Sequence, residues 1–394
     1  MSILFQQEIP RKKMINKDRL AETFRKLVMI DSISRQEAGI SEAVCQMLAP
    51  LKPEIIVDGA ADKTGSDTGN LIMRIAGSQN APPLMINAHM DTVQPGKAVV
   101  PEFSDGVFTS KGDTILGADD KSAIAIIIEA LLVIHENGLA CGPVELVFTI
   151  CEEIGLLGAK NLDFDLITAP FGYALDTSDT DVIITRAPAA NQFEIQLHGK
   201  DAHAGADPEQ GINAIHLASR AIAKLSLGRI DGETTCNIGV LEAPGATNIV
   251  PKHVLVKGEV RSHDEAKLQQ VTEHIVSTFE DVVSDYRDKH RLTDLPKLDV
   301  SIYKEFSATH IPDDHPVVLL ACKAATELGR PMSSKRSGGG SDANIFFENG
   351  IVTGVIGTGM TDIHSTRESI TLDDMVKSAE LVVEIIQKHA ENSA

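Results

Sequence analysis

The chain has 394 residues, of which 43% are hydrophobic and 23% are charged, and its formal net charge at pH 7 is −20. This length is too great for one ordinary hydrophobic core, so two domains of a soluble globular protein are expected. The excess of negative charge argues against nucleic acid or an acidic membrane surface as the main partner. The longest apolar run, residues 123–134, is interrupted by Glu129 and is too short to cross a bilayer.

The cysteines and the first residues both indicate a cytoplasmic protein. The five cysteines are scattered, odd in number and without a C-x-x-C pair, which fits a reducing compartment. Cys151 precedes two glutamates and is expected to be a buried side chain rather than a reactive thiol. Residues 1–13 lack the apolar stretch of a signal peptide and are expected to form a loose extension, with Met1 or Met14 as the start.

Predicted helices and strands alternate through the first part of the chain. Helical periodicity covers 17–50 and 121–136, and compact apolar runs predict strands over 71–75, 84–88, 145–150 and 171–175. Acidic or histidine motifs follow three of these strands directly. Because ligand sites of open α/β sheets lie beyond the carboxyl ends of the strands, these motifs are expected to meet at one edge.

The pattern changes after about Ile184. The order becomes strand, helix, strand, strand, helix, strand, which is typical of a ferredoxin-like unit. These elements are predicted over 193–198, 211–225, 236–241, 253–260, 264–283 and 298–303. From about His310 the alternation returns, with helices over 316–328 and 372–389, a strand over 351–356 and a loop over 333–340.

These two patterns predict an α/β domain that is interrupted by a small α+β domain. The α/β domain would comprise residues 1–186 and 306–394, and the insertion residues 187–305. Alternating runs alone do not prove the insertion. It is supported because residues that one site would need fall on both sides of it.

Five short motifs supply two histidines, several carboxylates and no cysteine. This mixture suits zinc, cobalt or manganese in a catalytic site, because structural zinc usually recruits thiolates. The motifs are His89-Met90-Asp91, Gly117-Ala118-Asp119-Asp120-Lys121, Glu152-Glu153, Leu175-Asp176-Thr177 and Ile363-His364-Ser365. Together they offer enough ligands for two metal ions, and two metals on a shared carboxylate are a known means of hydrolysing amides.

Each motif also has an ordinary structural explanation when it is taken alone. A histidine close to an aspartate is common in cores, and two acids at a helix start are favoured by the helix dipole. Glu152-Glu153 could be a solvated loop, and Asp176 or His364 could be a cap or turn residue. The functional interpretation separates Glu152 from Glu153, because neighbouring side chains diverge and one can bind metal while the other faces substrate.

Further candidates lie outside these motifs. His203 stands in a glycine-flanked turn, and Asn248 and Arg261 also stand out. Arg261 could either recognise a substrate carboxylate or form a surface salt bridge. The loop Gly338–Asp342 could bind an anion through its amides or be a flexible surface loop. It lacks the lysine of a phosphate-binding loop, which disfavours a phosphate-binding enzyme.

Taken together, and in this order and spacing, the motifs resemble those of the co-catalytic zinc exopeptidases, which include peptidase T, glutamate carboxypeptidase and the aminoacylases. The stretches Leu116–Lys121 and Ile86–Thr92 are most similar to the peptidase T branch. The resemblance covers nearly the whole chain beyond Met14. It implies a catalytic domain with a mixed central sheet flanked by helices, interrupted by a ferredoxin-like lid that also mediates homodimerisation.

The resemblance also implies a ligand set for two divalent ions, zinc first, with cobalt or manganese as alternatives. His89 and Asp176 would hold one ion, Glu153 and His364 the other, and Asp119 would bridge them. The peptide bond that follows the bridging aspartate is expected to be cis.

The remaining roles follow from the same resemblance. Asp91 would orient the histidine ligand, and Glu152 would be the general base that activates the metal-bound water. His203, supplied by the lid of a partner subunit, would stabilise the oxyanion. Asn248 and Arg261 would bind substrate.

The implied function is dinuclear-metal hydrolysis of amide bonds in short peptides, as an aminopeptidase of the tripeptidase kind. An N-acyl amino acid amidohydrolase uses the same chemistry and is the first alternative. A non-catalytic, metal-dependent peptide-binding module is the alternative from another class, and Glu152 speaks against it because a binder needs no general base. Substrate identity, physiological metal and closure of the lid stay open at this point.

Overall fold

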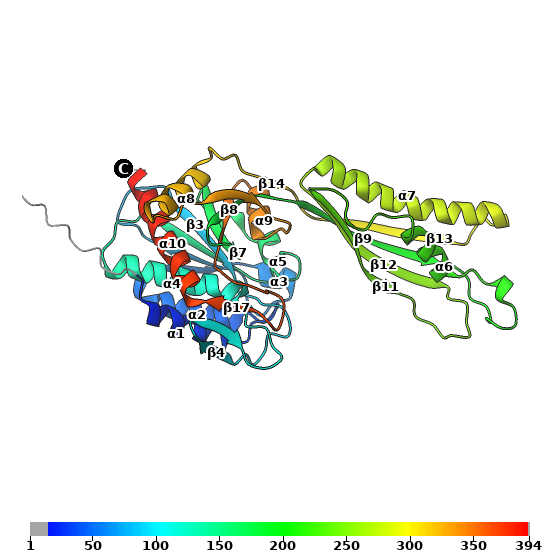
Figure 1. The fold of residues 1–394 in the computed structure, drawn as a ribbon, viewed down its shortest axis with the longest axis horizontal. Helices are drawn as coiled ribbons and strands as arrows, with labels where there is room; N and C mark the ends of the chain where they lie inside the picture. Colours follow the sequence, from blue (N-terminus) through cyan, green and yellow to red (C-terminus); the bar gives the residue numbers. More distant parts are fainter. Residues whose placement is uncertain (1–14, 393–394) are drawn as a thin grey trace, which may run out of the picture. The chain divides into compact units, whose positions relative to one another are not determined.

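The computed structural model describes residues 15–392, so the extension expected over residues 1–13 lies outside the described residues. The chain divides into two compact units (Figure 1). Unit 1 comprises Met1–Thr185, Ile311–Arg336 and Ser341–Ala394, and unit 2 comprises Arg186–His310 and Ser337–Gly340. The short segment Ser337–Gly340 belongs to unit 2, whereas the predicted boundaries assigned it to the α/β domain. It joins unit 2 because the Ser337 amide donates to the Arg186 carbonyl and Gly340 lies against the ring of Phe306.

Unit 1 contains the mixed central sheet that the family resemblance predicts. Its strands follow the order β1-β2-β6-β3-β7-β16-β8. The pairs β6–β3, β3–β7 and β7–β16 are parallel, and β1–β2, β2–β6 and β16–β8 are antiparallel. The bounds are β1 Glu54–Val57, β2 Leu71–Ile75, β3 Leu84–His89, β6 Val144–Thr149, β7 Phe171–Thr177, β8 Val182–Ala187 and β16 Val352–Gly357.

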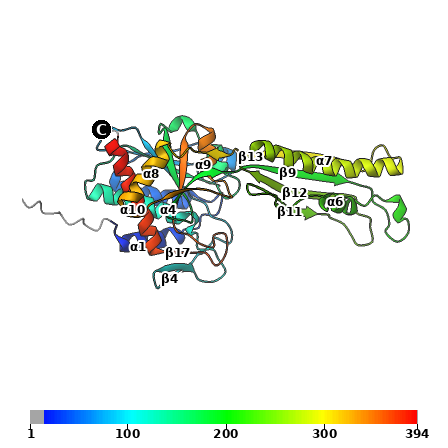
Figure 2. The same cartoon turned by 45° about the horizontal axis from the view of Figure 1, so that its top comes forward.

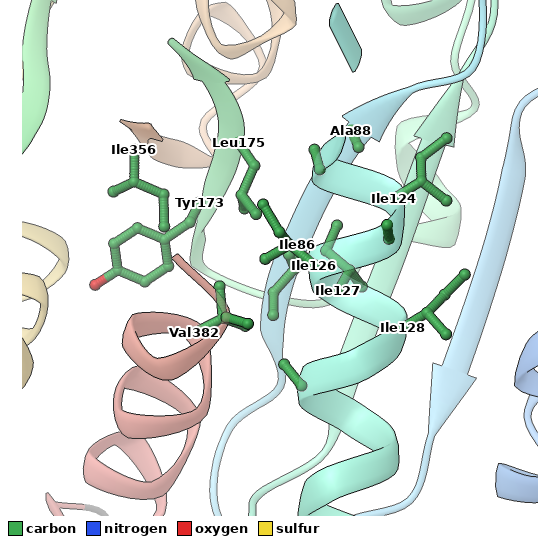
Figure 3. Packing of buried hydrophobic residues seen from close by; sticks show 14 of the residues in the cluster. Ile86, Ala88, Ile124, Ile126, Ile127, Ile128, Tyr173, Leu175, Ile356 and Val382 are labelled. Atoms are coloured by element: carbon green, nitrogen blue, oxygen red, sulfur yellow. The ribbon is translucent and has the colours of Figure 1, made fainter. Parts of the chain in front are cut away.

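Helices cover both faces of this sheet, which is why β3 and β6 are buried at every position. On one face, α4, α8 and α10 pack against the sheet, and α1 and α2 belong to the same hydrophobic cluster; α9 packs on the other face. Figure 3 shows the first of these faces, where Ile126 of α4 lies beside Ile86 of β3. The helices are α1 Lys17–Val28, α2 Ala38–Leu48, α3 Ala60–Thr64, α4 Ala118–Glu136, α5 Leu157–Lys160, α8 Pro316–Glu327, α9 Asp342–Glu348 and α10 Leu372–Asn392, with 3-10 turns at Ala49–Leu51 and Phe164–Leu166.

Several short elements of unit 1 were not predicted. A small sheet has the order β17-β5-β4, and β15 pairs with β8 inside the predicted glycine-rich loop. These strands are only three or four residues long, so they carry too little apolar periodicity to be recognised in the sequence. Their bounds are β4 Pro101–Ser104, β5 Val107–Ser110, β15 Ser333–Arg336 and β17 Ser369–Thr371.

Unit 2 has the predicted ferredoxin-like arrangement. Its antiparallel sheet has the order β10-β11-β12-β9-β13, and α6 and α7 pack on it around a second hydrophobic core (Figure 2). Alternate residues of β9, such as Phe193 and Ile195, point into this core. The bounds are β9 Ala189–His198, α6 Ala214–Ile222, β10 Gly228–Arg229, β11 Thr234–Glu242, β12 His253–Ser262, α7 Glu265–His290, β13 Lys297–Phe306 and β14 Thr309–His310, with a 3-10 turn at Pro208–Gln210.

No helix within residues 15–392 has the length and apolar character that crossing a bilayer requires.

Candidate metal centre

The five predicted metal ligands meet in unit 1. They come from the end of β3, the start of α4, the loop after β6, the end of β7 and the loop before β17. Donor atoms of His89, Asp119 and Asp176 lie within 4.8 Å of one another, and so do those of Asp119, Glu153 and His364. Asp119 belongs to both groups, which is the position that a bridging ligand requires.

The carboxylate of Asp119 presents each oxygen to a different histidine. Its Oδ1 lies 3.0 Å from Nε2 of His89, and its Oδ2 lies 3.3 Å from Nε2 of His364. The same Nε2 of His364 is 3.0 Å from the carboxylate of Glu153. Imidazole nitrogens and carboxylate oxygens without a thiolate are a donor set that fits two divalent cations, one on each side of Asp119.

Irregular backbone brings these side chains to the edge of the sheet. Asp119 and Asp120 have non-helical backbone angles, so the regular part of α4 begins at Lys121, as predicted. The peptide bond between the two aspartates is cis, as the resemblance implies. Cys151 has a positive φ of 52°, which turns the chain sharply after β6 and before the two glutamates.

Asp91 contacts both His89 and the backbone of the two glutamates. The closest partner of His89 Nδ1 is the backbone carbonyl of Asp91 at 2.9 Å, and the carboxylate is 3.5 Å away. A proton on Nδ1 directed at that carbonyl leaves Nε2 as the nitrogen that faces Asp119. The carboxylate of Asp91 accepts hydrogen bonds from the amides of Glu152 and Glu153, at 2.9 and 3.2 Å. One residue therefore fixes both the imidazole and the acidic pair.

The electrostatics of the cluster favour added positive charge. Hydrogen bonds with Asp119 and Glu153 raise the pKa of His364 to about 10. Burial would lower the pKa of His89, but its hydrogen bond with Asp119 helps to raise this pKa well above the usual value. Burial and neighbouring carboxylates raise the pKa of Glu152 well above its usual range. Protons are thus held tightly here, and bound cations would replace them.

Two buried carboxylates that were not predicted as metal ligands or catalytic residues lie near this centre. Glu37 accepts hydrogen bonds from the amides of Cys151 and Arg35, at 3.0 and 2.9 Å. Asp342 accepts a hydrogen bond from the Thr149 hydroxyl, and its Oδ1 is buried without a hydrogen-bond partner among the described residues. Each role depends on contacts between distant segments, so no local pattern in the sequence could have identified it.

Cys151 is buried, as predicted. Its thiol lies 3.4 Å from the carboxylate of Glu37. Burial, together with the negative charge of that carboxylate, raises the pKa of the thiol to about 12, so it stays protonated.

The three remaining predicted site residues lie in unit 2. His203 and Asn248 are exposed neighbours, because His203 forms a β-bridge with Ile249 and the Ala204 amide donates to the Asn248 carbonyl at 2.9 Å. Nδ1 of His203 accepts from the amides of Gly205 and Ala206 at 3.2 and 3.1 Å, so Nε2 carries the proton of the neutral ring.

Arg261 is already engaged by a carboxylate of its own strand. Its Nε and Nη2 each lie 3.0 Å from an oxygen of Glu259. Arg261 therefore forms the salt bridge that was one of its two predicted roles. A substrate carboxylate would compete with Glu259 for the same guanidinium group.

Comparison of the sequence with protein-family models shows which family this chain belongs to. Residues 85–388 match the model of the peptidase family M20/M25/M40. The match covers most of the chain and contains all five candidate ligands. The chain belongs to the peptidase family M20/M25/M40.

Individual relatives narrow the resemblance to the peptidase T branch. The uncharacterised protein YqjE of Bacillus subtilis (strain 168) is 40% identical over 379 residues, which is 96% of this chain and 100% of that protein. The crystal structure of the aminopeptidase PepT from Bacillus cereus ATCC 10987 has 39% identity and a TM-score of 0.86, with coverage of 96% and 100%. A tripeptidase structure from Staphylococcus aureus has 36% identity and a TM-score of 0.89, with the same coverage. These similarities confirm the resemblance on which the sequence prediction rested.

Proposed function

We propose that this protein is a dinuclear-metal aminopeptidase that hydrolyses short peptides. The observation that carries the proposal is the carboxylate of Asp119, whose two oxygens face His89 and His364 separately. The similarity to structures named as an aminopeptidase and a tripeptidase supports the choice of substrate class.

In this proposal His89 and Asp176 would hold one ion, Glu153 and His364 would hold the other, and Asp119 would be shared by both. The two ions would lower the pKa of a bound water and polarise the scissile carbonyl. Zinc is the proposed metal, because the ligands are nitrogen and oxygen donors from histidine and carboxylate, and cobalt or manganese suits the same set.

Glu152 is the proposed general base. A carboxylate oxygen of Glu152 lies within 4.8 Å of donor atoms of His89 and Glu153, so it reaches the space beside the proposed ligands. Burial raises its pKa, which matches a group that must accept a proton from water and later return it to the leaving amine. Asp91 holds the Glu152 amide and thereby limits the positions of this carboxylate.

The unit 2 residues complete the proposal. His203 would donate its Nε2 proton to the oxyanion, and Asn248 and Arg261 would bind the ends of the peptide. Residues 187–305 would act as a lid and dimerisation domain, so that His203 of a partner subunit completes each site. We place this homodimer in the cytoplasm, because scattered free cysteines suit a reducing compartment.

Two substrate panels test the proposal. Purified protein loaded with zinc is assayed against free tripeptides and against N-acyl amino acids. Release of the amino-terminal residue from free tripeptides supports an aminopeptidase, whereas turnover of blocked substrates alone would make the protein an amidohydrolase. Binding of peptides without any turnover would favour the non-catalytic module.

Replacing the proposed base separates its role from metal binding. Glu152→Gln keeps the shape of the side chain but cannot accept the proton, so kcat is expected to fall about 10²–10⁴-fold. The two ions should remain bound, as measured by elemental analysis. Glu42→Gln, at an exposed position of α2, is the control. A Glu152→Gln enzyme with near-normal kcat would show that another group is the base.

A further inference from the structure

Glu368 is a buried carboxylate that is not a candidate ligand, and only 1% of it is exposed. Its Oε2 accepts hydrogen bonds from the amides of Leu116 and Gly117, at 2.8 and 2.7 Å. Its Oε1 accepts a hydrogen bond from the amide of Asp119 at 3.0 Å. Three amides of one short segment therefore converge on one anion, which fixes the backbone that leads into Asp119.

The same residue ends the loop that carries His364. Thr361 and Ser369 exchange two backbone hydrogen bonds, of 2.9 and 3.1 Å, so the residues between them form a closed loop. Within that loop the Glu368 amide donates to the Ser365 carbonyl at 3.1 Å. Glu368 thus connects the loop of His364 to the segment of Asp119. Nε2 of His364 lies 3.3 Å from Oδ2 of Asp119.

We propose that Glu368 is a positioning residue that orients proposed ligands of both metal ions. This inference rests on the proposed function of the centre. Glu368 lies at the end of the loop that carries His364 and binds the backbone amides that lead into Asp119. It thereby sets the separation between Asp119 and His364. A carboxylate suits this task because both of its oxygens only accept hydrogen bonds. A glutamine would direct its amide hydrogens at one or more of the three donors and lose that contact.

A second buried glutamate allows positioning to be separated from simple stabilisation. Glu145 is 3% exposed and accepts hydrogen bonds from the amides of Thr168 and Ala169, at 2.9 and 2.8 Å. It lies at the other end of β6 from Glu152 and Glu153. If Glu368 only stabilised the fold, the two glutamates would respond alike to substitution.

The experiment compares Glu368→Gln with Glu145→Gln in the full chain. Zinc affinity is measured by competition with a chelator, and the unfolding temperature is measured in EDTA. Both variants are expected to unfold at a lower temperature than the wild type. Only Glu368→Gln should bind zinc more weakly, by about 10–100-fold, which is typical when a residue that orients metal ligands is lost. With a peptide that the wild type cleaves, the kcat of Glu368→Gln should fall while its KM changes little.

Two results would overturn the role of Glu368: wild-type zinc affinity in Glu368→Gln, or equal weakening in both variants. If Glu368→Gln does not fold, Glu368→Asp replaces it, since this variant keeps the charge but is too short to reach all three amides. Wild-type zinc affinity in a folded Glu368→Asp would likewise overturn the role. A wild-type protein that binds fewer than two ions refutes the proposed function itself, so the two failures are distinguishable.

Discussion

Apart from His364, whose side chain is half exposed, the candidate residues of unit 1 are buried or partly buried, whereas His203 and Asn248 of unit 2 are exposed. In unit 1, His89 and Asp119 are 2% and 6% exposed, and carboxylates such as Asp91 hold the amides of the segments around them. In unit 2, His203 and Asn248 are exposed on paired turns. A charged centre with a fixed backbone is thus built within one unit, while His203 and Asn248, which are proposed to contact substrate, lie on the surface of the other.

The largest effect is expected from removing Asp119, the proposed shared ligand of unit 1. Asp119→Ala is expected to abolish turnover and to release both ions, because each ion loses a carboxylate oxygen and the other ligands repel one another. Elemental analysis and peptide hydrolysis check the outcome. Asp113→Asn, at an exposed position close by in the sequence, is the control. Retention of two ions by Asp119→Ala would mean that this residue does not bridge them.

A substitution in unit 2 should affect catalysis without affecting the metals. His203→Ala removes the proposed oxyanion donor and is expected to lower kcat about 10²–10³-fold. Both ions should remain, because the ligands lie in unit 1. His216→Ala, an exposed histidine of α6, should behave as the wild type. An unchanged kcat in His203→Ala would remove this residue from the mechanism.

The core beneath the centre gives a stability prediction. Ile126 of α4 is fully buried against β3, so Ile126→Ala is expected to lower the free energy of unfolding by about 2–5 kcal/mol. Denaturant unfolding in EDTA measures the change without any contribution from bound metal. Leu319→Ala, which is 55% exposed on α8, should alter stability little. Similar values for the two variants would contradict the observed packing of α4.

The increase in stability that bound metal gives to the fold should depend on pH. The pKa of His364 is raised to about 10, so its ion pairs stabilise the metal-free fold below pH 6.5 and are lost as the pH rises towards 10. Metal binding runs the other way, because it must displace that proton and strengthens up to about tenfold per pH unit for each proton released. The rise in unfolding temperature on adding zinc should therefore grow between about pH 6 and about pH 8. A rise that is constant or shrinks would contradict this account.

The sequence predicted the parts of this molecule that depend on local pattern. Apolar runs located β2, β3 and β6, and the order of motifs predicted that the candidate ligands His89, Asp119, Asp176 and His364 should converge, as they do. It did not predict what holds those residues in place. Glu37 and Glu368 act on backbone amides far away in the chain, and no periodicity or spacing records such contacts. For the same reason, the sequence could not show that His89 lies closer to the carbonyl of Asp91 than to its carboxylate.

A crystal structure of the zinc-loaded protein, with anomalous scattering to locate the ions, would show whether Asp119 is shared by two metals. Two zinc ions are expected on the two sides of the Asp119 carboxylate, about 3.5–4 Å apart. One ion should contact His89 and the other His364. A single ion, or two ions that do not share Asp119, would contradict this expectation.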